Sequence, residues 1–173
     1  MKKIFLLFLL ALAFCAMPAE EACAKKVGAW TVGQRIDEMD DSVMLFAYTK
    51  SKNEIRGSSA IALPAMLTIA VQKGSGGPVV CAITQMPWLG IQEDIEVEYR
   101  IDKNPPSAIP SWNTNGGDAL RFFHFEYFLK ELYGAKTLLV RIPSRDGYSY
   151  TAKFNITGAK EALKDIAKAA GWQ

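Results

Sequence analysis

Residues 94–102 read Asp-Ile-Glu-Val-Glu-Tyr-Arg-Ile-Asp and carry the most regular pattern in the chain. Apolar and charged side chains alternate strictly along this stretch. The apolar positions are Ile95, Val97, Tyr99 and Ile101, and the charged positions are Glu96, Glu98, Arg100 and Asp102. Successive side chains of a β-strand point to opposite faces of its sheet, so one face of this strand is predicted to be buried and the other to meet solvent. The pattern is typical of an antiparallel sheet with one wet face.

Short strand patterns continue on both sides of this stretch. The predicted strands cover residues 30–32, 42–49, 67–72, 79–85, 94–102, 122–125, 138–142 and 148–156. Glycines at 74–78 separate two of these strands and can adopt the positive φ angles of a hairpin turn. Residues 103–117 are rich in Pro, Ser, Asn and Gly and are predicted to form a loop, with Trp112 in its middle.

Two helices are predicted near the C-terminus. The first is a short helix near residues 126–134, which Gly134 ends. The second covers residues 158–170, with Thr157 placed to cap its start and Gly171 its end. Its apolar stripe, at helical spacing, consists of Ala159, Ala162, Leu163, Ile166, Ala167 and Ala170. The expected fold class is therefore α+β: an antiparallel β-sheet or sandwich with two helices packed on it.

Residues 1–24 have the features of a secretory signal peptide. Two lysines precede an apolar run from Ile4 to Phe14, and the run is shorter than the roughly 20 residues that a membrane-spanning helix needs. Ala22-Cys23-Ala24 provides a small-x-small cleavage site. A lipoprotein site at Cys15 or Cys23 fits less well, because a bulky Phe precedes the first and two glutamates precede the second. We expect a periplasmic or secreted mature domain, residues 25–173.

The mature domain would keep the net charge of +2, because the removed segment contains two lysines and two glutamates. This balance, without a run of basic residues, gives no reason to expect a nucleic-acid partner. No second apolar segment of membrane length follows, so stable membrane insertion after cleavage is not expected. Cys81 would be the one remaining cysteine and is expected to be a buried small hydrophobe, so an intramolecular disulfide is excluded. The oligomeric state stays open.

No residue pattern predicts catalysis, a metal or a cofactor. The single histidine, His124, has no Cys-His cluster for zinc and no nucleophile elbow to serve. The acidic residues at 37–41 lack the spacing of an EF-hand, so a solvated turn is the simpler interpretation. The carboxylates of the 96–102 stretch are expected to form an ion-paired solvent face, with the paired acids of a glycosidase as the alternative.

Several motifs together resemble the TagO/VasI-like family of small secreted proteins associated with type VI secretion. These motifs are Trp30-Thr-Val, Asp40-Asp41-Ser42, Val97-Glu-Tyr-Arg-Ile-Asp102 followed by Trp112, Leu138-Leu-Val-Arg141, Phe154-Asn-Ile-Thr-Gly158, Ala162-Leu163 and Gly171-Trp172. The resemblance implies a non-enzymatic envelope protein. It also implies a pair of cysteines that is replaced here, at Ala70-Val71 and at Ala170. The strand-Gly-Ala-helix ending is similar, in addition, to invasion-associated periplasmic proteins.

Four residues are the candidate binding site: Arg100, Asp102, Trp112 and Arg141. Two arginines on wet strand faces and an aromatic in a loop could line one shallow ligand surface. In the alternative, Trp112 closes the edge of the core and each arginine pairs with a nearby acid. The leading functional hypothesis is an accessory or binding protein that contacts an envelope or secretion-apparatus partner. The other hypotheses are a cell-wall hydrolase using carboxylates of Glu96–Asp102, and a generic structural or inhibitory domain.

Overall fold

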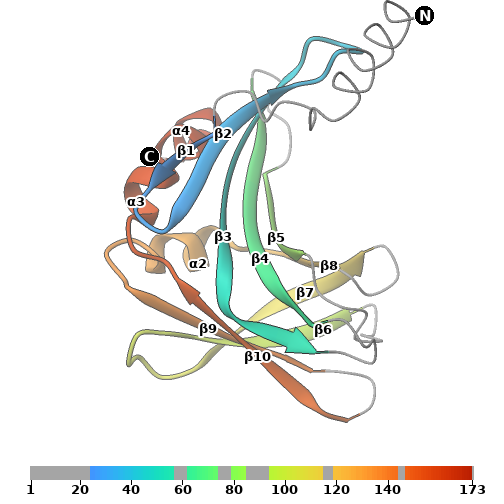
Figure 1. Ribbon diagram of the computed structural model, residues 1–173, viewed down its shortest axis with the longest axis vertical. Coiled ribbons are helices and arrows are strands. Elements are labelled where there is room, and N and C mark those ends of the chain that lie inside the picture. The colour runs from blue at the N-terminus through green and yellow to red at the C-terminus, as the bar shows by residue number, and fades with distance from the viewer. Residues whose placement is uncertain are drawn as a thin grey trace, which may run out of the picture.

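The computed structural model describes residues 24–56, 62–73, 79–84, 94–114, 119–143 and 147–172. Strands dominate these residues, and the helices are short (Figure 1). The strands are β1 (Lys25–Val27), β2 (Trp30–Ile36), β3 (Val43–Arg56), β4 (Ala62–Lys73), β5 (Val80–Thr84), β6 (Asp94–Ile101), β7 (Ser107–Thr114), β8 (Ala119–Phe122), β9 (Thr137–Pro143) and β10 (Ser149–Asn155). The helices are α2 (Glu126–Glu131), α3 (Ala159–Ala162) and α4 (Lys164–Ala169).

Eight of the strands form a closed antiparallel barrel, in the order β3-β10-β9-β6-β7-β8-β5-β4, and β4 pairs with β3 to close it. The expected antiparallel sheet with two helical regions is confirmed, but the described fold is mostly β rather than α+β, and the sandwich is wrong. Strand alternation could not distinguish the two architectures, because a sandwich and a barrel both bury one face of each strand.

The long strand β3 makes the closure possible. β4 pairs along its whole length on one edge, whereas its other edge pairs first with β2 and then, at Ser51, with β10. The register between β3 and β4 shifts between Lys50 and Glu54, and the Ser51 hydroxyl accepts a hydrogen bond from the backbone N–H of Ala65 there (2.9 Å). Such a bulge bends and twists a strand, so β3 can leave one sheet direction and enter the barrel wall.

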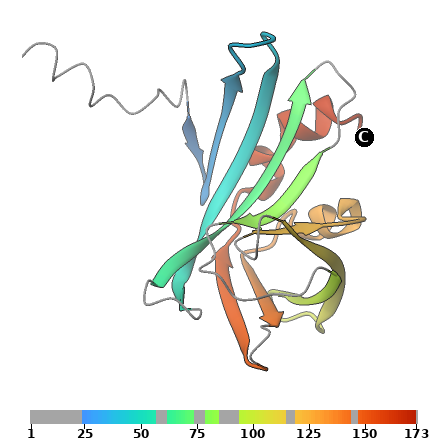
Figure 2. The same cartoon turned by 90° about the vertical axis from the view of Figure 1, so that its right-hand side faces the viewer.

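A two-stranded extension lies beside the barrel. β1 and β2 form a hairpin on the first half of β3, and this hairpin reaches beyond the barrel together with the ends of β3 and β4 (Figures 1 and 2). Its turn is held against the C-terminal segment, since the backbone N–H of Ala29 donates to the carbonyl of Thr157 (2.9 Å). The fully buried Trp30 donates its indole N–H to the carbonyl of Ile156 (3.2 Å).

The central strand behaves as its alternation predicts. Val97, Tyr99 and Ile101 of β6 are buried in the barrel, whereas Glu96, Glu98 and Arg100 are exposed on its outer surface. Helix α2 packs Phe128 against Tyr99 and Phe122, with ring centroids 4.9 and 5.6 Å away. The apolar face of β6 is therefore part of the core, and its charged side chains lie on the outer surface of the barrel.

Residues 103–117 differ from the expected loop, because residues 107–114 form β7 between β6 and β8. The Pro, Ser and Asn residues of this segment are typical of loops, so the composition did not predict the strand. The carbonyl of Pro110 accepts a hydrogen bond from the N–H of Phe123 (2.9 Å), just beyond the end of β8. The backbone of Pro110 therefore faces the end of β8, where the lack of an N–H removes little of the β7–β8 pairing, so a proline is tolerated. The strand expected at 122–125 lies earlier, at Ala119–Phe122.

The helix near residues 126–134 is confirmed as α2. The helix expected at 158–170 is present but interrupted: Leu163 separates α3 from α4. Gly158, with φ of 88°, precedes α3, so the expected Thr157 cap is wrong, and the Thr157 hydroxyl donates to Asn155 instead (2.8 Å). Gly171 does end the segment with a positive φ of 73°. The turn of the hairpin at 74–78 and residues 1–23 of the predicted signal peptide at 1–24 lie outside the described residues.

The C-terminal helices cover the inner face of the extension. α4 contacts β3 and β4, and α3 contacts β2. The larger members of the predicted stripe, Leu163 and Ile166, are buried, together with Ala159 and Ala162. No helix among the described residues is both long enough and apolar enough to cross a membrane.

Candidate functional site

The structure separates the four candidate residues. Arg100 and Arg141 lie on the outer surface where β6 meets β9, while Trp112 lies on β7 opposite Asp94, at the other end of β6. Six residues of strand separate positions 94 and 100, which corresponds to about 20 Å. Trp112 therefore does not line the same hollow as the two arginines, and a binding role for these residues stays a prediction.

The outer surface around Arg100 and Arg141 contains a shallow hollow of about 250 Å³. It is lined by Glu98, Tyr99, Arg100, Pro106, Leu139, Arg141 and Thr151. Arg141 donates to the Glu98 carboxylate (2.7 Å), and both side chains are more than half exposed. An exposed ion pair of this kind contributes little to stability. It does hold Glu98 and Arg141 together on the outer face, as the ion-paired interpretation of this strand expects.

Asp102 has a structural role. It ends β6 with a positive φ of 49°, and its carboxylate accepts hydrogen bonds from the backbone N–H of Thr137 (2.8 Å) and of Lys136 (3.1 Å). These bonds attach the end of β6 to the start of β9. The carboxylate is therefore already used within the fold and is not directed at the arginine hollow.

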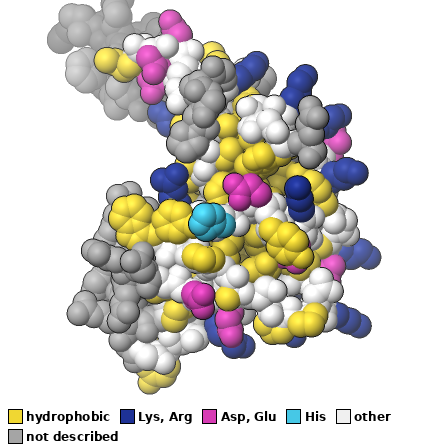
Figure 3. All heavy atoms as spheres, turned by 180° about the vertical axis from the view of Figure 1, so that it is seen from behind, with side chains coloured by type: hydrophobic (Ala, Val, Ile, Leu, Met, Phe, Trp, Pro, Cys, Tyr) yellow, Lys and Arg dark blue, Asp and Glu magenta, His cyan; other side chains and the backbone are white. Residues whose placement is uncertain are grey.

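Trp112 belongs to a different surface, which we call the aromatic face: Pro110, Trp112 and Phe123. Trp112 pairs with Arg121, and the Phe123 N–H bonds to Pro110, so these side chains share the outer side of β7 and β8. Trp112 is 44% exposed and Phe123 38%. His124 follows immediately, with φ of 51° and an exposed side chain. Figure 3 shows hydrophobic side chains gathered around the histidine on this side of the molecule.

Other ionisable groups fit structural roles. Burial raises the pKa of the Cys81 thiol, which lies in the core as predicted. Burial, reinforced by a hydrogen bond from its hydroxyl to Glu131 (2.7 Å), also raises the pKa of Tyr99. The acidic turn after β2 is exposed: the Asp37 carboxylate accepts from Met39 N–H, and a hydrogen bond with Ser42 lowers the pKa of Asp40. Within the described part of the chain, no cluster of metal-ligating side chains occurs.

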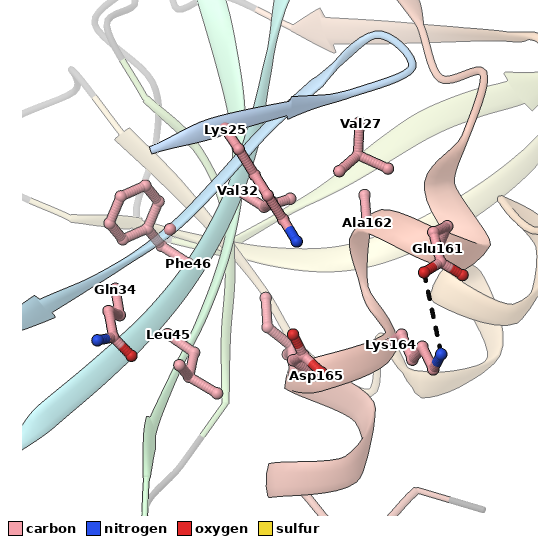
Figure 4. Close-up of a pocket in the computed structure, with 12 residues that line it drawn as sticks. Lys25, Val27, Val32, Gln34, Leu45, Phe46, Glu161, Ala162, Lys164 and Asp165 are labelled. Carbon is pink, nitrogen blue, oxygen red and sulfur yellow. Dashed lines mark ion pairs between the residues drawn. The ribbon is translucent and has the colours of Figure 1, made fainter. Parts of the chain in front are cut away.

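Sequence reasoning missed a groove between the β1–β2 hairpin and the C-terminal helices (Figure 4). Its volume is about 490 Å³. Val32, Leu45 and Ile166 contribute apolar surface, and Lys25 projects into the groove from β1, while Asp165 lies on the helical side. Glu161 on the same side pairs with Lys164 (3.9 Å). Because the two sides are more than 100 residues apart in the chain, no local pattern could reveal this groove.

These observations define the class as a small closed β-barrel with a helical C-terminal cover. No protein-family model matches the chain, and no curated protein does. The fold is similar to the crystal structure of invasion-associated protein B from Bartonella henselae, with a TM-score of 0.58, covering 85% of this chain and 97% of that chain. The sequence identity is 14%, so the likeness concerns the fold alone.

Proposed function

We propose that the protein is a non-enzymatic binding or accessory protein of the bacterial periplasm, which contacts an envelope or secretion-apparatus partner. The aromatic face carries this proposal. Two large aromatic side chains are partly exposed beside Pro110: Trp112 on β7, and Phe123 just beyond the end of β8. Contiguous apolar surface of this kind marks interaction sites, and Trp is enriched among the residues that dominate binding energy. The resemblance to TagO/VasI-like proteins supports the choice of partner, and the predicted signal peptide supports the compartment.

The hydrolase alternative receives less support from the geometry. A glycosidase needs two carboxyl groups that flank the scissile bond. Here the carboxylate of Glu98 is paired with Arg141, and that of Asp102 is bonded to two backbone N–H groups. Glu96 and Glu98 lie on the outer barrel surface, and the inward face of β6 is apolar. These positions favour a charged exterior over a catalytic cleft.

Site-specific photocross-linking in the periplasm tests the proposal. A photoreactive residue replaces Trp112 in one variant and Tyr148 in the other, because Tyr148 is also an exposed aromatic side chain, at 71%, but lies just before β10. We expect a discrete cross-linked species from position 112 and none from position 148. Equal cross-linking from both positions, or from neither, would contradict the aromatic face as the contact site and favour a generic structural role.

Two further measurements complete the test. Purified protein incubated with peptidoglycan should release no soluble fragments, whereas release that is lost in Glu98→Gln would establish the hydrolase instead. The intact mass of the exported protein should correspond to a chain that begins near Lys25. A diacylglyceryl mass on Cys15 or Cys23 would show a lipoprotein.

A further inference from the structure

The second half of β2 has an edge that no described strand covers. β3 pairs with β2 from Thr31 to Ile36 on one side. On the other side β1 pairs only as far as Val32. Ala24, just before β1, lies beside Gly33, since a Cβ at Gly33 would come 3.3 Å from the Ala24 Cα. Among the described residues, the backbone of Gln34 to Ile36 therefore has a neighbour on one edge only.

Hydrogen-bonded and non-bonded residue pairs alternate along β2 and β3, and this alternation shows which backbone groups of β2 face the open edge. The N–H of Asp37 donates to the carbonyl of Ser42 (2.9 Å), which makes this a hydrogen-bonded position between β2 and β3, while the Ser42 N–H donates to the Asp40 carboxylate. Bonded and non-bonded pairs alternate along an antiparallel ladder, so Arg35 bonds to Met44 and Gly33 to Phe46. Gln34 and Ile36 must then direct their N–H and C=O groups away from β3, toward the open edge.

The open edge borders the groove between the hairpin and the helices. Gln34 lines this groove, together with Val32 and its neighbour Leu45 on β3. Ile36, two residues further along the same face, is 54% exposed. Natural proteins usually block a free edge with proline, a bulge or a covering element. Here the edge combines available backbone groups with exposed apolar surface.

We propose that this edge and groove bind an extended segment of a partner polypeptide, which adds to β2 as a strand in line with β1. The backbone groups of Gln34 and Ile36 call for alternating N–H and C=O partners at strand spacing, which an extended polypeptide supplies. Alternate side chains of the added strand would face the helices, over Val32 and Leu45. These positions require apolar residues, and the outward positions can be polar.

The chemistry of the groove also limits the occupant. Lys25 and Asp165 carry opposite charges on its two sides, and Glu161 is paired with Lys164. A strongly anionic or cationic ligand would therefore meet a like charge at one of the two sides. A nearly neutral strand of alternating apolar and polar residues fits both. This inference does not rest on the aromatic face, which lies on β7 and β8.

Proline substitution tests the assignment of the edge. Gln34→Pro removes an N–H that makes no bond to β3, so the fold should be retained, with nearly unchanged circular dichroism and melting temperature. Arg35→Pro is the matched control. It removes an N–H within the β2–β3 ladder and should lower the melting temperature clearly. Equal effects of the two variants on the melting temperature would contradict the assignment of the Gln34 N–H to the open edge, and the proposal with it.

Binding is measured with a displayed library of random linear peptides, about ten residues long, selected on the exported wild-type protein. We expect selected peptides with apolar residues at every second position, whose affinity falls at least about tenfold with Gln34→Pro. In the bound peptide, every second amide N–H would face β2, and the amides between them would face away. N-methylation of the amides that face β2 should abolish binding, and N-methylation of the others should not. A Trp112→Ala variant should bind these peptides normally, which separates this site from the proposed function.

Three results would overturn the inference. The first is a selection that yields no peptide above background. The second is an affinity that is unchanged in Gln34→Pro or insensitive to which set of amides is N-methylated. The third is a dimer, detected by sedimentation and dissociated by Gln34→Pro, which would assign the edge to a second copy of this chain.

Discussion

At the scale of single residues, the carboxylate of Asp102 joins two strands that are distant in sequence. Asp102 has a left-handed backbone conformation at the end of β6, and its carboxylate accepts hydrogen bonds from the N–H of Lys136, just before β9, and of Thr137, the first residue of β9. Asp and Asn adopt this conformation more readily than other non-glycine residues, so the residue type suits both tasks.

Asp102→Ala should therefore lower the free energy of unfolding by about 1–2 kcal/mol, since it loses the acceptor and keeps an unfavourable φ. Asp102→Asn retains an acceptor and a tolerated φ and should cost less. Asp102→Gly relieves φ but removes the acceptor, so it separates the two contributions. Chemical denaturation of the three variants provides the measurement, and a harmless Asp102→Ala would refute the structural role.

At the scale of elements, the interrupted C-terminal helix is held by its apolar face. Leu163 and Ile166 are almost fully buried, whereas Lys164 and Lys168 are exposed. Leu163→Ala and Ile166→Ala should each reduce the free energy of unfolding by about 2–5 kcal/mol. Lys164→Ala and Lys168→Ala are the controls and should change it by less than about 0.5 kcal/mol, because even the Glu161–Lys164 pair is exposed. Thermal and urea unfolding measure all four variants, and similar losses for Leu163 and Lys164 would contradict this packing.

The same element tests the resemblance to the type VI secretion-associated family. That resemblance pairs Ala170 with the hairpin position 70–71. Val71 lies on β4, which α4 contacts, and its side chain is buried (2% exposed), whereas Ala70, the preceding strand residue, is only half-buried and has its side chain on the opposite face. Cysteines at 71 and 170 should therefore cross-link under oxidation, because a disulfide needs Cα atoms within about 7 Å.

Cysteines at 70 and 170 are the matched control and should stay reduced, as non-reducing electrophoresis would show. If neither pair forms, the alignment fails at its two most informative positions. The functional inference that rests on this resemblance should then be withdrawn, while the fold and the aromatic face would be unaffected.

At the scale of the whole molecule, the N-terminal hairpin and the C-terminal segment meet at two glycines, Gly28 and Gly158. Gly28 has φ of 59°, and a Cβ there would collide with the backbone carbonyl oxygen of Thr157. Gly147 also has a positive φ, of 82°, but a Cβ there would meet nothing within 4 Å. Both alanine variants incur the conformational penalty of roughly 1–2 kcal/mol, and only Gly28→Ala adds a backbone collision.

Gly28→Ala should therefore destabilise the protein more than Gly147→Ala, and thermal unfolding measures the difference. Gly28→Ala should also increase hydrogen exchange at Ala29, whose N–H bonds to Thr157. Equal melting temperatures for the two variants would show that the hairpin is not held against the C-terminal segment in this way.

Local patterns predicted most of the strands and both helical regions correctly. Strict alternation in 94–102 and helical spacing in 159–170 reflect one-sided burial, which depends only on the near neighbours along the chain. The loop prediction for 103–117 failed because β7 is stabilised by β6 and β8 on its two sides, which overrides its Pro- and Ser-rich composition. The grouping of the candidate residues also depended on strand pairing. Arg100 and Trp112 both face outward, but Trp112 pairs with Asp94, six residues along β6 from Arg100.

The sequence by itself therefore determined most of the strands, which side of β6 is buried and that Cys81 lies in the core. The tertiary structure alone decided that the sheet closes, through pairing of β3 with β4 and β10, and that a groove forms between β2 and the C-terminal helices. The physical reason is the range of the interactions. Periodicity records burial within one element, whereas closure and the groove depend on contacts between segments up to more than 100 residues apart, which no local pattern encodes.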